Sequence, residues 1–154
     1  MSSIIDVCGE LETAAAANAL QVRSLTAGDV ATASTWLNRR MKTKAPNAAD
    51  FPRELLPVTG LAAWQNDKLL AVATLYLERS SPVAVCGWCI ADPDNPPGIS
   101  YRAINTIMLG MPQYAQKHGA KYLLTTFGNR GINAILDNIG FQTAEYSENK
   151  LLII

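Results

Sequence analysis

The chain has 154 residues, of which 49% are apolar and 17% are charged. This length fits one domain with a single hydrophobic core, and the composition is that of a globular protein rather than a disordered or fibrous chain. Thirteen basic residues balance thirteen acidic ones. No overall field therefore draws the protein onto nucleic acid or an anionic membrane, and we expect neither as a partner.

The N-terminal segment 1–20 is rich in alanine, has acidic residues and lacks a basic start. It does not resemble a secretory signal, and it predicts a short helical lead ahead of the domain. No apolar run reaches the ~20 residues of a membrane span. The three cysteines are an odd, small number that suits a reducing compartment better than a disulfide framework. We therefore expect a cytoplasmic protein.

Short alternating or continuous apolar runs predict strands in the rest of the chain, and apolar residues three and four apart predict helices. The predicted elements are a strand at 21–25, a helix at 30–41, strands at 59–64, 68–77 and 83–91, a helix at 104–115, a strand at 121–127, a helix at 132–139, and strands at 141–146 and 150–154. This mixed order predicts an α/β (α+β) fold, a sheet with helices on both faces, as one domain over 21–154.

Several local patterns fix the ends of these elements. Thr26 and Asp29 form a capping-box pattern that opens the first helix, and Gly119 and Gly140 suit the ends of the later two. The basic residues at 39–44 suit the negative end of the helix dipole, and a basic rim for an acidic or nucleic-acid partner is the alternative. The apolar tail 151–154 suits a core strand, with a sheet edge in a homodimer as the second interpretation.

The segment 83–91 reads VAVCGWCIA and is apolar on both faces, which predicts a central, doubly covered strand. Cys86 and Cys89 invite a dithiol redox interpretation. Residues three apart in a strand point to opposite faces, so strict alternation places Cys86 with Ala84 and Trp88 and places Cys89 on the other face. Such a pair does not easily close a disulfide, and we predict buried structural cysteines rather than a thiol oxidoreductase.

His118 is the single histidine, which limits both metal binding and nucleophilic catalysis. A structural zinc site needs about four ligands, so we expect no metal. His118 falls in the last turn of a predicted helix, where a capping role is expected. The chain also lacks a P-loop and the glycine fingerprint of dinucleotide-binding proteins, which weighs against nucleotide hydrolysis and hydride transfer.

A turn reading NPPGIS, from Asn95 to Ser100, lies between the central strand and the next helix. A glycine and small residues let backbone amides approach a ligand, and a helix N-terminus adds positive potential, so the turn suits a pyrophosphate. Glycine and proline at such a place also suit a plain turn.

The segment Asn129–Phe141, NRGINAILDNIGF, resembles the final motif of the Gcn5-related N-acetyltransferase (GNAT) superfamily, in which an asparagine opens the last helix and Gly-Phe closes it. The turn NPPGIS then aligns with that family's acyl-CoA pyrophosphate loop. The two motifs occur in the family's order, and the resemblance covers 21–154. It implies a mixed, mostly antiparallel central sheet with helices on both faces.

The resemblance implies a set of acyl-CoA-binding residues. The backbone of the central strand's end would hold pantetheine where it splays from the strand at 121–127, the amides of the turn would hold the pyrophosphate, and an asparagine would touch pantetheine. These cofactor-binding residues are Cys89, Ile90, Ala91, Asn95, Gly98, Ile99, Ser100, Tyr101 and Asn129.

The sequence departs from the family pattern at four places. Asn95 replaces the usual glutamine or arginine, Pro96 and Pro97 remove backbone donors, and Ser100 stands in for glycine or alanine. Leu136 stands where members often carry a tyrosine acid, seven residues after Asn129. Tyr101 is the candidate substitute acid, with a partly exposed structural tyrosine as its alternative role. Glu78 and Asp92 are the candidate bases, with solvated surface charge as the alternative role for both.

The resemblance therefore predicts an N-acyltransferase that uses acyl-CoA, expected to be acetyl-CoA, and transfers the acyl group directly to a small-molecule or protein amine. The departures keep a second hypothesis open. In that hypothesis the chain is a catalytically degenerate GNAT-like binding or structural module.

Overall fold

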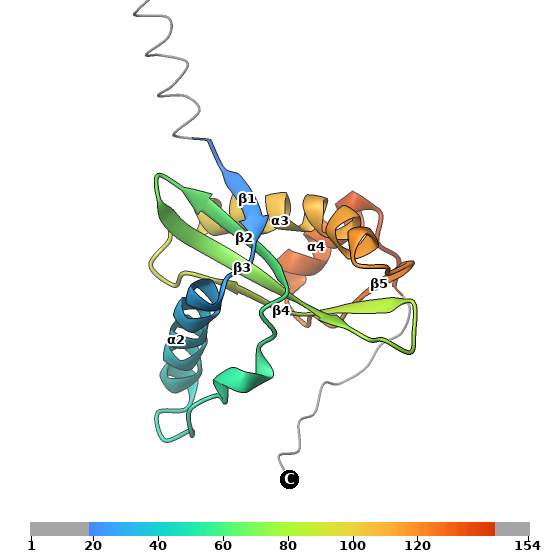
Figure 1. Cartoon of the computed structure of the whole chain (residues 1–154). Helices are drawn as coiled ribbons and strands as arrows, with labels where there is room; N and C mark the ends of the chain where they lie inside the picture. The colour runs from blue at the N-terminus through green and yellow to red at the C-terminus, as the bar shows by residue number, and fades with distance from the viewer. Residues whose placement is uncertain (1–18, 144–154) are drawn as a thin grey trace, which may run out of the picture.

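A computed structural model describes residues 19–143 of the chain. Most of the predicted lead, the last predicted strand and the second half of the strand predicted at 141–146 lie outside the described residues. Within the described part, 141–143 carry no strand. The described residues form a sheet with helices packed on both of its faces (Figure 1). One domain extending to residue 154 stays a prediction.

The sheet has five strands in the order β1-β2-β3-β4-β5. The strands are β1 (Gln21–Ser24), β2 (Gly60–Gln65), β3 (Lys68–Leu77), β4 (Val83–Ala91) and β5 (Tyr122–Thr125). Neighbours pair antiparallel except β4 and β5, which are parallel. The predicted mixed, mostly antiparallel sheet with helices on both faces is confirmed.

The predicted hairpin of β2 and β3 closes on Asn66 and Asp67. Both residues have positive φ, 50° and 57°. A two-residue turn of this kind matches the right-handed twist of the flanking strands, and asparagine and aspartate tolerate it better than most residues. The turn therefore sets the register of two strands that both lie in the core.

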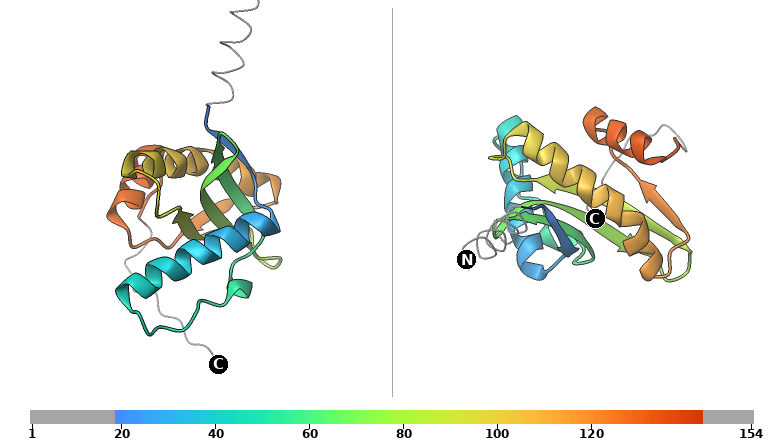
Figure 2. Two further views of the ribbon diagram at one scale, coloured as in Figure 1. Left: turned by 90° about the vertical axis from the view of Figure 1, so that its left-hand side faces the viewer. Right: turned by 90° about the horizontal axis from the view of Figure 1, so that it is seen from above.

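Helix α2 (Ala27–Lys44) covers one face of the sheet (Figure 2). The predicted capping box forms: the Thr26 hydroxyl accepts from the Asp29 N–H at 3.2 Å, and the Asp29 carboxylate accepts from the Thr26 N–H at 3.0 Å. Val30, Ala33 and Leu37 point at the sheet and pack in a buried cluster with Val72 and Ile90. The 3-10 turn η1 (Arg53–Leu55) lies in the connection that follows.

Helices α3 (Pro97–Lys117) and α4 (Arg130–Ile139) cover the other face (Figure 2). Ile107, Met108 and Met111 of α3 are wholly buried against β2, β3 and β4. Gly140 ends α4 with φ 110°, while the Phe141 N–H bonds to Leu136 O and the Gly140 N–H to Asp137 O. This is the Schellman geometry that a glycine makes accessible. None of the helices in residues 19–143 is long and apolar enough to cross a bilayer.

A β-bulge in β4 corrects the predicted assignment of its side chains to faces. The register passes from Thr74 opposite Trp88 to Leu75 opposite Cys86, which leaves Gly87 without a partner on β3. The extra residue shifts the alternation by one. Cys86 and Cys89 therefore lie on the same face, toward α3, while Trp88 joins the cluster under α2.

The strand predicted at 121–127 as buried is shorter and more exposed than expected. β5 spans only Tyr122–Thr125, and the side chains of Tyr122 and Leu124 are 65% and 41% exposed. Within β5, Leu123 alone packs against the α3 core. Apolar residues occupy both faces of β5, but only one of those faces lies under helices, so the prediction from composition alone was wrong.

We expect Gly87→Ala to destabilise the protein by about 1–3 kcal/mol, because it forces overpacking at the bulge. A Cβ at Gly87 would lie 2.6 Å from Tyr76 Cε2, inside contact distance. Chemical denaturation measures the change. The matched control is Gly128→Ala, since a Cβ there meets nothing within 4 Å. Equal stability of the two variants would contradict a close contact at the bulge.

Candidate functional site

β4 and β5 separate halfway along β4. Their parallel pairing runs from Val83 with Tyr122 to Cys86 with Thr125, and β4 then continues alone on that side to Ala91. Over this second half β4 still pairs with β3, from Trp88 opposite Thr74 to Ala91 opposite Ala71. Backbone groups that face away from β3 beyond Cys86 therefore have no strand partner within residues 19–143, which is the edge at which an extended ligand adds to a sheet.

The predicted residues Cys89, Ile90 and Ala91 all lie on this unpaired half of β4. Ile90 and Ala91 are 1% and 7% exposed, so their side chains belong to the cores on either side and only their backbone can meet a ligand. Cys89 is half buried and packs against the α3 core. The structure thus brings the three residues to the splayed edge as the sequence predicted, and their contact with a ligand stays a prediction.

The side chains beside the bulge form a hydrogen-bonded aromatic group on the α2 face. Trp88 Nε1 donates to the Tyr76 hydroxyl at 3.0 Å, and that hydroxyl donates to Leu55 O at 2.5 Å. Phe51 meets the Trp88 ring edge-on, with centroids 4.9 Å apart. This arrangement fixes the connection after α2 over the splayed half of β4. Sequence reasoning missed this group, because the bulge that turns Trp88 to this face leaves no mark in the residue pattern.

The segment NPPGIS is the start of α3 rather than a separate loop. The helix begins at Pro97 with Pro96 as its N-cap, and neither a side-chain cap nor an acidic residue is present in its first turn. The N–H groups of Ile99 and Ser100 both donate to Pro96 O, at 3.0 and 3.3 Å. Of the amides predicted to hold a pyrophosphate, the Gly98 N–H alone has no backbone acceptor within the described residues.

Asn95 holds the turn before α3 against β3. Its Nδ2 donates to Leu70 O at 2.9 Å, and the same carbonyl accepts from the Asp92 N–H at 2.9 Å. The Asn95 Oδ1 is buried and has no hydrogen-bond partner within residues 19–143. Sequence reasoning expected Asn95 to replace a phosphate-binding side chain, whereas its amide nitrogen is engaged in positioning the helix start.

Asn129 caps α4. Its Oδ1 accepts from the Gly131 N–H at 2.8 Å and from the Ile132 N–H at 3.2 Å. Asn133 adds a bond from its Nδ2 to Phe127 O at 2.9 Å, which holds the segment that leaves β5. Asn129 is exposed, and its amide nitrogen has no hydrogen-bond partner within residues 19–143, which leaves it available to a ligand. A contact between Asn129 and pantetheine stays a prediction.

The candidate acid and base lie far apart. Tyr101 sits in the first turns of α3 and is 49% exposed, whereas Glu78 lies in the β3–β4 connection at the opposite end of β4. Hydrogen bonds from the Ser80 N–H, at 3.0 Å, and then from its hydroxyl hold the pKa of Glu78 below its ordinary value. A lowered pKa makes Glu78 a weaker base, and its place sets it apart from Tyr101.

The candidate base Asp92 and its neighbour Asp94 are ion-paired. Asp94 receives two hydrogen bonds from Arg39 of α2, at 2.9 and 2.5 Å, and Asp92 lies 3.6 Å from Lys68 Nζ. These bonds from Arg39 hold the pKa of Asp94 below its usual range. Sequence reasoning had placed Arg39 only at a helix end, because its partner lies far along the chain.

Other features of the described residues carry no chemistry of this kind. A hollow of about 970 Å³ is lined by the end of α3, the start of β5 and the end of α4, including Gln116, Tyr122 and Phe141. It lies at the paired end of β4 and β5, away from the splay. The described part holds no group of three or more metal-ligating side chains.

Burial disfavours the ionised form of both thiols of β4. It raises the pKa of Cys86, with a smaller contribution from the neighbouring Cys89, and it raises the pKa of Cys89 to about 12. Both cysteines are free thiols. The bulge removes the argument that they point to opposite faces, but a thiolate is the reactive form, so the raised pKa values disfavour redox chemistry.

In a Cys8→Ser background we expect Cys86 and Cys89 to resist Ellman's reagent at pH 8.5. An ordinary thiol is about half ionised at this pH, whereas a thiol with the pKa of Cys89 is ionised on the order of one part in a thousand or less. The rate at which the reagent labels these two thiols is measured by absorbance. It should become fast only after the protein is denatured or as the pH is raised. Fast labelling of the native protein would revive the dithiol interpretation.

Comparison with solved structures identifies the fold as that of acetyltransferases. A Salmonella typhimurium protein described as an acetyltransferase, solved with its cofactor acetyl-CoA, superposes with a TM-score of 0.63 and 13% identity, covering 81% of this chain and 80% of that one. N-acetylglutamate synthase of Neisseria gonorrhoeae, complexed with coenzyme A and N-acetyl-glutamate, superposes with a TM-score of 0.57 and 18% identity, covering 82% of this chain and 29% of that one.

An aminoglycoside acetyltransferase from an uncultured soil metagenomic sample, in complex with sisomicin, gives a TM-score of 0.52 and 12% identity, covering 88% of this chain and 96% of that one. No family model and no curated protein matches the sequence. The chain therefore has the GNAT fold, as its two motifs predicted, and at these identities the likeness is one of fold.

Proposed function

We propose that this protein is a divergent GNAT acyltransferase that transfers an acyl group from acyl-CoA, expected to be acetyl-CoA, directly to an amine. The observation that carries the proposal is the splay of β4 from β5 beside the uncapped N-terminus of α3. In support, fold neighbours have been solved with acetyl-CoA and with coenzyme A.

The two halves of the opening suit the two halves of acyl-CoA. Pantetheine is an extended chain with amide groups, and the unpaired backbone of 87–91 offers it the hydrogen bonds of an added strand. The pyrophosphate suits the first turn of α3, where the Gly98 N–H has no backbone acceptor within residues 19–143 and the helix dipole favours negative charge. The exposed Asn129 amide nitrogen is a further donor for pantetheine at the side of α4.

Acyl transfer from a thioester to an amine needs few catalytic side chains. A neutral amine attacks the thioester carbonyl and forms the C–N bond, the amine nitrogen then gives up a proton to water, and the sulfur leaves with the electron pair of the broken C–S bond. An ordinary thiol has a pKa of about 8.5, so the departing thiolate is stable enough to take its proton from water or from a weak acid. Tyr101 is the acid that we propose, in the absence of a tyrosine at position 136.

The acceptor that we propose is a small-molecule or protein amine. Among the fold neighbours, one is complexed with N-acetyl-glutamate, an N-acylated amino acid, and an aminoglycoside acetyltransferase is complexed with sisomicin, so proteins of this fold hold small nitrogen compounds of different size. Fold alone does not choose between acceptors. The cytoplasmic location and the homodimer stay predictions from the sequence.

A second function, a binding or structural module without catalysis, is favoured by one specific observation. Leu136 is 3% exposed and packs in the core with Ile135, so the position at which related enzymes often carry their acid is filled by an apolar side chain. Binding of acyl-CoA without turnover of any amine would select this function over the first.

We expect the protein to bind coenzyme A and Gly98→Glu to weaken that binding at least tenfold. A glutamate in the first turn places negative charge where the phosphate would lie, yet it interacts well with the helix dipole, by about 0.3–1 kcal/mol. A Cβ at Gly98 meets no atom within 4 Å, so the site accepts a side chain. Calorimetry measures binding, and thermal melting measures stability.

Gly98→Gln is the matched control, because it has the same shape without the charge. The glutamate variant should be at least as stable as the glutamine variant while binding coenzyme A more weakly. If the wild-type protein gave no heat of binding and no thermal shift with saturating acetyl-CoA, the proposed function would fail.

For Tyr101→Phe we expect kcat to fall about 10- to 100-fold with little change in the KM for acetyl-CoA, because only the proton donor is removed. A thiol-release assay over a panel of amines measures turnover. The control is Tyr122→Phe, a tyrosine that is also exposed but lies on β5. Equal kcat values for the two variants would leave water as the proton donor.

A further inference from the structure

The connection between β4 and α3 carries two carboxylates immediately before the proposed phosphate site. Asp92 and Asp94 precede Gly98 by six and four residues. The Asp94 N–H donates to Asp92 Oδ1 at 2.9 Å, so the two residues form one compact turn. Negative charge at this place opposes the binding of a polyanion, since unit charges at such separations repel through water.

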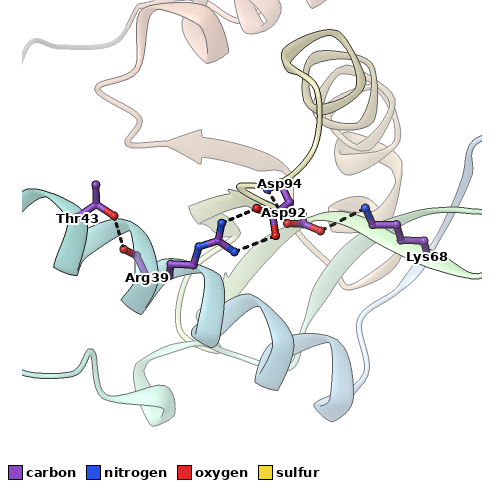
Figure 3. A network of polar contacts seen from close by, with 5 residues as sticks. All are labelled: Arg39, Thr43, Lys68, Asp92 and Asp94. Carbon is purple, nitrogen blue, oxygen red and sulfur yellow. Dashed lines mark hydrogen bonds and ion pairs between the residues drawn. The ribbon is translucent and has the colours of Figure 1, made fainter.

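Each carboxylate is matched by a cation from another element (Figure 3). Arg39 of α2 binds Asp94 through both terminal nitrogens, Nη1 to Oδ2 at 2.9 Å and Nη2 to Oδ1 at 2.5 Å. Lys68 of β3 lies 3.6 Å from Asp92 Oδ2. The planar fork of an arginine suits a carboxylate in this two-point manner, so Arg39 is held at Asp94 rather than merely near it.

The pair between Arg39 and Asp94 is poorly placed to stabilise the fold. Their side chains are 54% and 66% exposed, and exposed ion pairs contribute little to the free energy of unfolding. The turn is already tied to β3 by Asn95 and Leu70. The effect of the pair is therefore expected in the local potential at the start of α3 rather than in stability.

We propose that Arg39 is the counter-ion that makes the start of α3 acceptable to the polyphosphate of acyl-CoA, acting by neutralising Asp94 rather than by touching the phosphate. The inference rests on the proposed function, because it concerns the same site. Arg39 then acts on the ligand indirectly, through Asp94. Its positive charge comes from α2, which lies on the opposite face of the sheet from α3.

The direction in which three variants change the affinity for coenzyme A separates this role from the alternatives. Arg39→Gln leaves the negative charge of Asp94 without a counter-ion and should weaken the binding of coenzyme A about three- to tenfold. This is the effect expected of one unit charge roughly 10 Å from a doubly charged group in a largely aqueous medium. Asp94→Asn leaves the positive charge of Arg39 without a counter-ion and should tighten the binding of coenzyme A by a similar factor. The double variant should bind within about twofold of the wild-type protein.

Titration calorimetry with coenzyme A at low and at high salt is the experiment, with thermal melting of every variant. The differences should shrink at high salt, because ions screen exposed charges, and the melting temperatures should stay close together. The control is Lys42→Gln, which removes the same charge one turn further along α2 and breaks the ion pair with Asp50 instead. It should change binding less than Arg39→Gln.

Each other result overturns the inference in a recognisable way. If Arg39→Gln and Asp94→Asn both weaken binding, the pair is a mechanical anchor. If the double variant binds as weakly as Arg39→Gln, then Arg39 touches the phosphate itself. If the wild-type protein binds and Arg39→Gln changes nothing, only this inference fails, whereas absence of binding by the wild-type protein removes the proposed function and the inference together.

Discussion

The unequal edges of β4 are the constraint on which the rest of the structure depends. Along one edge β4 pairs with β3 from Ala84 to Ala91, and along the other it pairs with β5 only from Val83 to Cys86. The first edge holds β4 in the sheet, so the second can be left open without loss of the core. An opening made this way is lined by backbone, which explains why its lining residues include buried apolar side chains such as Ile90.

The bulge at Gly87 lies where this opening begins, and it changes what every later residue of β4 faces. Trp88 turns to the α2 layer, where its indole bonds to Tyr76 and its ring meets Phe51. Cys89 turns to the α3 layer, beside Cys86. A single extra residue thus joins the connection after α2 to the splayed edge and places two thiols together in surroundings that keep them protonated.

The start of α3 combines a positive helix end with nearby negative side chains. Its first turn has no cap and no acid, which leaves the Gly98 N–H available to a ligand. The turn that leads to it nevertheless uses the Asp92 carboxylate to accept a hydrogen bond from the Asp94 N–H, and Asp94 brings a second negative charge. Arg39 and Lys68 reconcile the two requirements, since each supplies a charge from a different element of the fold.

The sequence by itself determined the element order, the hairpin, the caps and, through two motifs, the fold, because these depend on residues close together along the chain. Through the same two motifs it also predicted that Cys89–Ala91 and Gly98 line one opening. Only the tertiary structure decided the bulge, the exposure of β5, the loss of the Ile99 and Ser100 amides to Pro96, and the pairing of Arg39 with Asp94. A bulge and a contact 55 residues apart depend on packing between layers, which local patterns do not record.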